Sequence, residues 1–499
     1  MHPRRLTLSL ALLLAGCRAP ESADTIFFAS GADLQSINPL VTTHPLARQV
    51  QRYVLFTTLF RYDSALVVQP YLAESWMWSA DHTSLVLHIR HDVRWHDGVQ
   101  TDGRDVQFTL DAARDPAAGY PRAAELSCLQ TVAVQDLYTV TLGFCRPQTT
   151  IPDVLTDLAI LPDHLLRRTT HDARLTASFE DHPVGNGPFR FVEHVANRRW
   201  IFEANPDFPV QLGGPPKVHR LAVVVVDEAT TKLAGLVDGE LDVAGINAMH
   251  AGVVRRVAQR AVLEYPLLLT YGLVWNTSRA PFNDVRLRRA LTMALDRRQM
   301  LDAYIYGFGV VADGPVPPSH PLAAPVPHIS FDRAAARALL DSLGYGPGGH
   351  RLAFTLTTVG TSDNVLEQLI QADLAAVGAD VRIRQLELGA FLAAAQGTAR
   401  DYDALVTGIT GDLSLGYLDA LFDSRRLDGP LQYAQYRNPE VDRDLAAGDF
   451  DAVQRIVARD VPITFLYHAR GIQGVNQRVH GIRMDLRGEM PTVAQWRIQ

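Results

Sequence analysis

Cysteine is scarce in this 499-residue sequence, and positive charge is not in excess. The three cysteines are too few to form a metal site without further ligands. The 47 Lys and Arg residues are outnumbered by 54 Asp and Glu residues, which gives a net charge of −7. No basic field is therefore present that would attract nucleic acid or anionic lipid.

Long apolar runs and catalytic motifs are also missing. The apolar region from Leu6 to Ala15 is too short to span a bilayer as a stable helix, and no second long apolar stretch exists. There is no Gly-x-Ser-x-Gly elbow, no His-Glu-x-x-His motif and no supported Ser-x-x-Lys motif. Because each catalytic class needs a nucleophile or a metal cluster, the sequence predicts neither enzyme activity nor a cofactor.

What is present is an ordinary globular composition, 47% hydrophobic and 20% charged. A chain of this length is expected to form two or more domains. Two stretches have helical periodicity, Arg48 to Leu59 and Val285 to Leu301. The second carries five arginines, which we interpret as a solvated helix face rather than an anion site.

Four histidines crowd one block of the sequence, His82, His88, His91 and His96. A first-row metal site needs three or four ligands that converge on one point. His88 lies on the polar side of a predicted strand and His91 at its corner, so these side chains should diverge. We expect them to be structural or solvated, and we predict no metal site.

The N-terminus has the pattern of a secretory signal. Arg4-Arg5 precedes the apolar run, and Leu14-Ala15-Gly16-Cys17 follows it. This last segment resembles a bacterial lipobox, which implies cleavage after Gly16, diacylation of Cys17 and a membrane-anchored, extracytoplasmic protein. The alternative is an ordinary secretory peptide with an incidental cysteine.

Cys128 and Cys145 flank a predicted hairpin of two strands, Thr131 to Gln135 and Thr139 to Phe144. If the turn centres on Asp136-Leu137, the two cysteines face each other across the hairpin. An extracytoplasmic compartment permits a disulfide between them. Free buried thiols are the alternative, because a one-residue slip would turn one cysteine to the other face.

The stretch from Pro70 to Leu110 is the densest in local signals. Apolar residues alternate from Leu85 to Ile89, which predicts a half-buried strand, and Val93 to His96 predicts a second short one. Asp97-Gly98 is a turn dipeptide, and Thr101 occupies the N-cap position of a following helix.

This block resembles the large extracytoplasmic solute-binding proteins of ABC importers, in the subfamily that carries dipeptides, oligopeptides and nickel complexes. The resemblance is carried by Leu72-Ala73-Glu74-Ser75-Trp76, by Val93-x-Trp95-His96-Asp97-Gly98 and by Pro183-Val184-Gly185-Asn186-Gly187-Pro188-Phe189. Family members usually have Thr where this sequence has Asn186. The similarity extends from about residue 25 to 486.

The resemblance implies an α/β, bilobed, periplasmic-binding-protein-like fold of type II, in the large three-domain form. Lobe I would comprise residues 25–47, 183–268 and 475–499, with an extra α/β subdomain at 48–182. Lobe II would comprise residues 269–474. Two chain crossings, near Leu269–Trp275 and Tyr467–Gly474, would form a hinge that lets the lobes close on a ligand.

The resemblance also implies site residues. In peptide-binding members a Trp-Thr-Gly-Asp-like segment ends a strand, and its aspartate pairs with the α-ammonium of the peptide; here the segment is Ile409-Thr410-Gly411-Asp412. The aromatic residue is replaced by Ile409, and Asp412 has the alternative role of capping a turn. Asp33 and Asn38 belong to a corner at the cleft edge and are the other expected ligand neighbours.

The expected function is that of a lipid-anchored, monomeric substrate-binding component that captures a small peptide or similar polar solute for the permease of an ABC transporter. Within the binding class, a sugar, an opine or a nickel or other metal chelate is an alternative ligand. A sensory ligand-binding protein without transport is the alternative from a different class.

Overall fold

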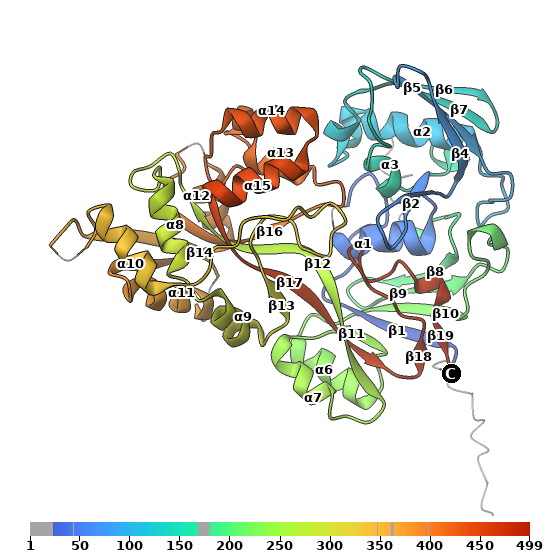
Figure 1. Cartoon of the computed structure of the whole chain (residues 1–499). Helices are drawn as coiled ribbons and strands as arrows, with labels where there is room; N and C mark the ends of the chain where they lie inside the picture. The colour runs from blue at the N-terminus through green and yellow to red at the C-terminus, as the bar shows by residue number, and fades with distance from the viewer. Residues whose placement is uncertain are drawn as a thin grey trace, which may run out of the picture.

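Two long antiparallel strands, β12 (Arg260–Trp275) and β17 (Ile463–Asn476), run from one lobe of the molecule into the other (Figure 1). They belong to an eleven-stranded sheet that extends through both lobes. The computed structural model describes residues 23–42, 44–167, 179, 181–346, 348–360, 364–397 and 399–499. In the described part of the chain, no helix is both long enough and apolar enough to cross a membrane.

The first lobe is built from both ends of the chain and from its middle. Its strands outside the subdomain are β1 (Thr25–Ser30), β2 (Phe60–Tyr62), β3 (Val68–Pro70), β8 (Phe189–Val195), β9 (Arg199–Ala204), β10 (Arg220–Val225), β11 (Val243–Gly245), β18 (Val479–His480) and β19 (Arg497–Ile498). Its helices are α1 (Pro45–Val50), η1 (Gln51–Leu55), η4 (Val210–Leu212), α6 (Ala229–Asp238), η5 (Ala248–His250), α7 (Ala251–Val254) and η7 (Val493–Gln495).

The sheet order in this lobe is β17-β11-β1-β10-β9-β8. β1 pairs in parallel with both β10 and β11, and Thr25 lies opposite Arg220. Parallel strands are covered on both faces, which explains why β10 reads as a continuous apolar run rather than an alternating one.

A subdomain inserted after β3 has its own four-stranded antiparallel sheet, in the order β4-β5-β7-β6. Its elements are β4 (Ala73–Trp78), β5 (Ser84–Ile89), α2 (Gly103–Arg114), η2 (Pro116–Ala118), η3 (Ala123–Leu126), β6 (Leu129–Asp136), β7 (Thr139–Phe144), α3 (Val154–Asp157) and α4 (Asp163–Leu166). A disulfide joins Cys128 to Cys145 at the open end of the β6–β7 hairpin.

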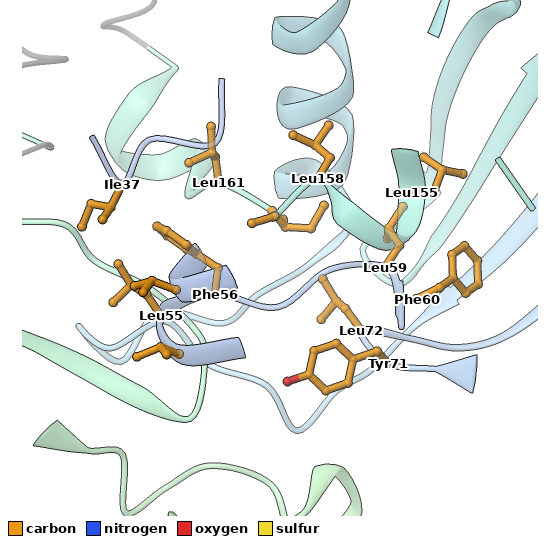
Figure 2. Packing of buried hydrophobic residues seen from close by; sticks show 14 of the residues in the cluster. Ile37, Leu55, Phe56, Leu59, Phe60, Tyr71, Leu72, Leu155, Leu158 and Leu161 are labelled. Carbon is orange, nitrogen blue, oxygen red and sulfur yellow. The ribbon is translucent and has the colours of Figure 1, made fainter. Parts of the chain in front are cut away.

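The subdomain shares one hydrophobic core with the rest of the first lobe. Figure 2 shows the junction, where Leu155, Leu158 and Leu161 from the α3 region pack near Phe56 and Leu59. Gly185 and Gly187 belong to the same junction. A Cβ on Gly185 would lie 1.9 Å from the carbonyl oxygen of Leu55, so only glycine permits this close approach.

In the second lobe the strands follow the order β15-β14-β16-β12-β17, and two hydrophobic clusters pack against them. Its strands are β13 (Gly309–Val311), β14 (Leu352–Val359), β15 (Ala379–Leu386) and β16 (Ala404–Thr410). Its helices are α8 (Val285–Met293), α9 (Arg297–Ile305), α10 (Arg333–Ser342), α11 (Val365–Ala375), α12 (Leu388–Gln396), α13 (Tyr417–Phe422), η6 (Ser424–Arg426), α14 (Pro439–Ala447) and α15 (Phe450–Asp460).

The pairing along β12 changes between the lobes. Arg260 to Pro266 pair with β17 alone, whereas Thr270 to Val274 pair with β17 on one side and with β16 on the other. The β12–β17 register shifts between Pro266 and Thr270 and again between Tyr271 and Gly272. The predicted crossings thus lie on these two strands, and the domain limits at residues 269 and 474 stay a prediction.

Several local expectations were wrong. Val93 to His96 form no strand, only an isolated bridge between Arg94 and Gln100. Asp102, not Thr101, caps α2. Its side chain accepts a hydrogen bond from Arg104 N, and the side chain of Asp105 accepts a hydrogen bond from Asp102 N. This reciprocal capping box satisfies two backbone donors, which a single threonine cannot do.

Two predicted helices also differ in extent. The first ends at Leu55 instead of Leu59, because the chain from Phe56 onward is extended and buries residues on both sides. The second is broken into α8 and α9, where Asp296 starts a new helix by accepting from Gln299 N. Apolar spacing alone does not distinguish a buried extended segment from a helix.

The β6–β7 hairpin has the predicted register only near the disulfide, where Leu129 faces Phe144. Two irregularities then shift the pairing, so that Asp136 faces Thr139 and the turn centres on Leu137-Tyr138. Asp136 accepts from Tyr138 N at 2.8 Å, which fixes the turn one residue later than expected.

Candidate functional site

The carboxyl ends of two sets of parallel strands face each other across the connection between the lobes. In the first lobe β1, β10 and β11 run in one direction, and β11 is antiparallel to β17. In the second lobe β14, β15 and β16 are parallel, and β16 is antiparallel to β12. Because β12 and β17 are themselves antiparallel, both sets point toward the opposite lobe. Open α/β sheets bind ligands at such carboxyl ends.

Asp33 follows β1 at the first-lobe rim, and its carboxylate is engaged by the fold. It accepts from Trp200 Nε1 at 2.7 Å and from Asn197 N at 2.6 Å, and His194 Nε2 lies 3.3 Å away. Burial acts to raise the pKa of Asp33, but these hydrogen bonds outweigh it and lower the pKa. Asp33 therefore ties the rim to the β8–β9 hairpin.

Asn38 is buried in its own turn at the same rim. Its Oδ1 accepts from Leu40 N at 3.0 Å, and its carbonyl accepts from Val41 N at 3.3 Å. The next residue, Pro39, lines a small cavity beside α1. Asn38 thus holds the turn from residue 38 to 41 in place. Contact with a ligand stays a prediction for both Asn38 and Asp33.

The segment from Ile409 to Gly411 ends β16 at the second-lobe rim. Ile409 is buried in the core of the lobe, so its side chain contributes packing there. Thr410 is exposed and pairs with Leu269 of β12. Gly411 N donates to Leu268 O at 2.7 Å, and a Cβ on Gly411 would lie 2.9 Å from the Tyr417 ring. These contacts fix the loop that carries Asp412.

The Asp412 carboxylate accepts four hydrogen bonds from its own loop. Oδ1 accepts from Ser414 N, Ser414 Oγ and Gly416 N at 2.7 to 3.0 Å, and Oδ2 accepts from Tyr417 N at 2.8 Å. The turn-capping role is therefore present in the structure. Oδ2 accepts only one of these four hydrogen bonds, so it is the carboxylate oxygen with room for a further donor.

Asp412 is also close to the facing wall of the first lobe. Burial raises the pKa of Tyr62, and the negative charges of Asp153 and Asp412 raise it further. Burial likewise raises the pKa of Glu125 against the effect of Arg122, and Asp412 adds to the rise. The negative charge of Asp412 in the second lobe therefore acts on Tyr62 and Glu125 of the first lobe.

Three arginines surround one buried carboxylate in that wall. Asp157 is only 7% exposed at its side chain and accepts from Arg48, Arg52 and Arg122. Burial would raise the pKa of Asp157, but the three guanidinium groups hold it well below its usual range. Sequence reasoning missed this cluster, because only the Arg48–Arg52 spacing is local.

Arg122 connects this cluster to two further carboxylates. Its Nη2 donates to Asp153 at 2.9 Å and to Glu125 at 2.6 Å, while Nη1 donates to Asp157 at 2.8 Å. Planar guanidinium groups suit such multiple carboxylate contacts. The wall is therefore a charged network rather than an apolar surface.

Two arginines of the second lobe correct the interpretation of a solvated helix face. Arg288 is 4% exposed and donates to Phe282 O at 2.7 Å and Val461 O at 2.9 Å. Arg297 is 6% exposed and donates to the carbonyls of Ala312, Ile329 and Phe465. Burial lowers the pKa of both groups. Except for Phe282, these partners lie 15 or more residues away in the sequence, so helical spacing could not predict this burial.

The histidine block does not converge. His82 Nδ1 contacts Gln148 O at 3.1 Å, and the His91 ring stacks near Tyr138. His96 Nε2 donates to Gly187 O at 3.0 Å, and its Nδ1 accepts from Gly185 N at 3.2 Å. Within the described ranges, no group of three or more His, Cys, Asp or Glu side chains is arranged to hold a metal ion.

Two lobes joined by paired strands, with facing carboxyl strand ends, define a binding protein of the periplasmic-binding-protein-like class. Residues 67–425 match the family described as bacterial extracellular solute-binding proteins, family 5. The chain belongs to this family. Membership confirms the predicted fold class and the prediction that the protein binds solutes rather than catalysing a reaction.

Individual relatives cover nearly the whole chain. The oligopeptide-binding protein AppA of Bacillus subtilis is 24% identical over 530 residues, 98% of this chain and 96% of its own. The glutathione-binding protein GsiB of Salmonella paratyphi A is 26% identical over 456 residues, 89% of this chain and 87% of its own.

Solved structures share the fold at similar coverage. AppA of B. subtilis, solved with a nonapeptide, has a TM-score of 0.74 and 23% identity, over 95% of this chain and 99% of its own. HbpA2 of Haemophilus parasuis has a TM-score of 0.83 and 22% identity, over 95% and 100%. NikZ of Campylobacter jejuni, solved with Ni(L-His), has a TM-score of 0.75 and 22% identity, over 95% and 99%.

Proposed function

We propose that this protein is the substrate-binding component of an ABC importer and captures a small peptide or related polar solute between its lobes. The observation that carries the proposal is the Asp412 loop, which follows β16 at the second-lobe rim and whose carboxylate acts electrostatically on Glu125 and Tyr62 of the first lobe. Relatives named for oligopeptide and glutathione binding support a peptide-like solute.

Closure would bring the two walls together on the solute. The register shifts in β12 lie at the connection between the lobes, where few residues can absorb a change in backbone angles. The remaining acceptor position on Asp412 Oδ2 would take an ammonium proton of the solute, in a site less screened than the protein surface. Permease subunits are the protein partners of this proposal.

Native mass spectrometry of the protein purified without refolding tests the solute class, because a tightly held solute survives mild purification. We expect a bound mass that is released on unfolding and fragments as a peptide or peptide derivative. If the released mass is instead a sugar, an opine or a metal chelate, the solute is not a peptide, although the protein still binds a solute. Absence of any bound solute, together with no binding from a peptide mixture, would overturn the proposal.

The anchor is a separate part of the proposal. Cys17 lies outside the described residues, and the support for lipidation is the Leu14-Ala15-Gly16-Cys17 pattern after an apolar run. Cys17→Ser should release the protein from membranes into the soluble extracytoplasmic fraction. Wild-type protein that is already fully soluble on fractionation would contradict lipid anchoring.

A further inference from the structure

A hollow of about 550 Å³ lies at the sheet edge of the second lobe, over β14, β15 and the residues that lead into β16. Its volume falls in the range of about 300–1,000 Å³ that is typical of small-molecule sites. Asp412 lies past the other end of β16, so the hollow is separate from the cleft rim. The residues that matter for its chemistry are Arg279, Thr357, Arg382, Arg384, Asp401 and Asp403.

Two arginines of β15 stand on one face of the sheet. Arg382 and Arg384 are two residues apart in the strand, so their side chains project to the same side. Both are exposed, and neither forms an ion pair with a residue that the structure describes. Asp380, the preceding residue on this side, pairs instead with Arg351. The two guanidinium groups are therefore available to an external anion.

The carboxylates in the hollow already have partners. Asp401 accepts from Arg279 Nη2 at 2.9 Å. Asp403 accepts from Thr355 N at 2.9 Å, and its other oxygen lies 3.9 Å from Arg279 Nη1. Three arginines thus line the hollow against two aspartates, and one of the three arginines is shared by both aspartates.

A buried hydroxyl group beside these arginines lacks a partner. Thr357 of β14 lies opposite Arg384 in the parallel pairing, so the two side chains share a face. Thr357 is 1% exposed, and its Oγ1 has no hydrogen-bond partner among the described residues. Because buried polar groups are nearly always hydrogen-bonded, this hydroxyl favours a partner that the chain itself does not supply.

Guanidinium groups and a hydroxyl donor together suit an oxyanion. Guanidinium groups bind phosphate oxygens through paired, charge-assisted hydrogen bonds. A phosphate group offers enough acceptor oxygens for two guanidinium groups and a hydroxyl at once. The exposed arginine side chains can turn toward such a group without disturbing the sheet.

We propose that this hollow is a second binding site, which takes a phosphate group through Arg382, Arg384 and Thr357. The site goes beyond the proposed function, because solute capture uses the cleft at the other end of β16. The phosphate can belong to a soluble phosphate ester or to a phospholipid headgroup, and the two arms of the experiment separate these sources.

The first arm titrates the whole protein with glycerol 3-phosphate at low ionic strength and follows the heat of binding. We expect one site on the wild type. Replacing both Arg382 and Arg384 by Gln should weaken binding about tenfold or more, because charge-assisted hydrogen bonds are lost. Arg298→Gln changes an exposed arginine of α9 in the same lobe, and this matched control should bind like the wild type.

The hydroxyl is tested separately by Thr357→Val, which keeps the shape of the side chain. The affinity for glycerol 3-phosphate should fall about threefold or more, because one hydrogen bond is lost. The urea midpoint should not fall, since a hydroxyl without a partner contributes no stability. A lower midpoint with unchanged affinity would show that the hydroxyl serves the fold, and would overturn its assignment to the site.

The second arm measures sedimentation with phosphatidylcholine vesicles that contain or lack phosphatidylglycerol. It uses the Cys17→Ser protein, so that the proposed lipid anchor does not contribute. Binding to the anionic vesicles that is lost in the double arginine variant, and kept in Arg298→Gln, would assign a phospholipid headgroup. Binding of glycerol 3-phosphate alone would assign a soluble phosphate ester.

The outcomes decide the proposal without reference to the cleft. If neither probe binds the wild type, or if the double arginine variant binds both probes as the wild type does, the phosphate site is overturned. Solute capture is measured independently by native mass spectrometry, so either result leaves the proposed function to its own test.

Discussion

Replacing Asp157 by Asn should destabilise the protein far more than the same change at Asp153. Asp157 is buried and accepts from three arginines, one of which comes from α1, one from η1 and one from the loop before η3. Asparagine keeps the shape but removes the charge. The guanidinium groups would then lack their counter-charge in a site with little access to water.

The magnitude depends on what each arginine retains. Arg48 is about one-third exposed and can be hydrated, and Arg122 keeps Asp153 and Glu125. Arg52 is only 16% exposed and keeps one long hydrogen bond, 3.4 Å to Arg487 O, and the face of the Tyr53 ring, whose centroid is 5.1 Å away. Losing a partner from a buried pair costs about 3–5 kcal/mol, and we expect about 3 kcal/mol here because only Arg52 is left stranded.

Urea unfolding at neutral pH, followed by circular dichroism, measures the difference. Asp153→Asn is the matched control and should cost about 1 kcal/mol, because Arg122 keeps two of its three carboxylates. If Asp157→Asn unfolds within 1 kcal/mol of the control, the three-arginine cluster contributes no more than an ordinary surface pair, and the reasoning is refuted.

The other contacts lead to three further expectations. Replacing Cys128 and Cys145 by serine opens a loop with a sequence separation of 17 and should lower the free energy of unfolding by about 3 kcal/mol, and an unchanged urea midpoint would count against this. Asp412→Asn should weaken binding of the solute identified by mass spectrometry by about 2–5 kcal/mol and, through its loop hydrogen bonds, stability by about 1 kcal/mol. Calorimetry within threefold of wild type would leave Asp412 a structural role only. Burial lowers the pKa of His96 and His468 to about 4, so stability should fall by roughly 3 kcal/mol for each as pH drops from 6.5 to 4, and a flat unfolding profile over this range would exclude it.

Local pattern predicted much of the fold. Alternation from Leu85 to Ile89 predicted β5, and helical spacing from Val285 predicted α8. The bilobed arrangement came from the family resemblance instead, because the pairing of β12 with β17 joins segments about two hundred residues apart. Periodicity describes one element at a time and carries no information on which strands pair.

The candidate site was harder to predict from the sequence, because its contacts also join segments that are distant in the chain. Asp412 was identified by its motif, but its four loop hydrogen bonds depend on the turn that follows. Through these hydrogen bonds Asp412 contributes to the stability of its loop as well as to the candidate site. The cluster around Asp157 depends on three segments that meet only in the folded protein.

Small-angle scattering of the whole protein with and without its solute tests the central claim most directly. Capture between two lobes requires that they approach each other, with the movement absorbed where β12 changes its pairing. We expect a smaller radius of gyration at saturating solute than in the solute-free protein. Identical radii, with saturation shown independently by calorimetry, would contradict it.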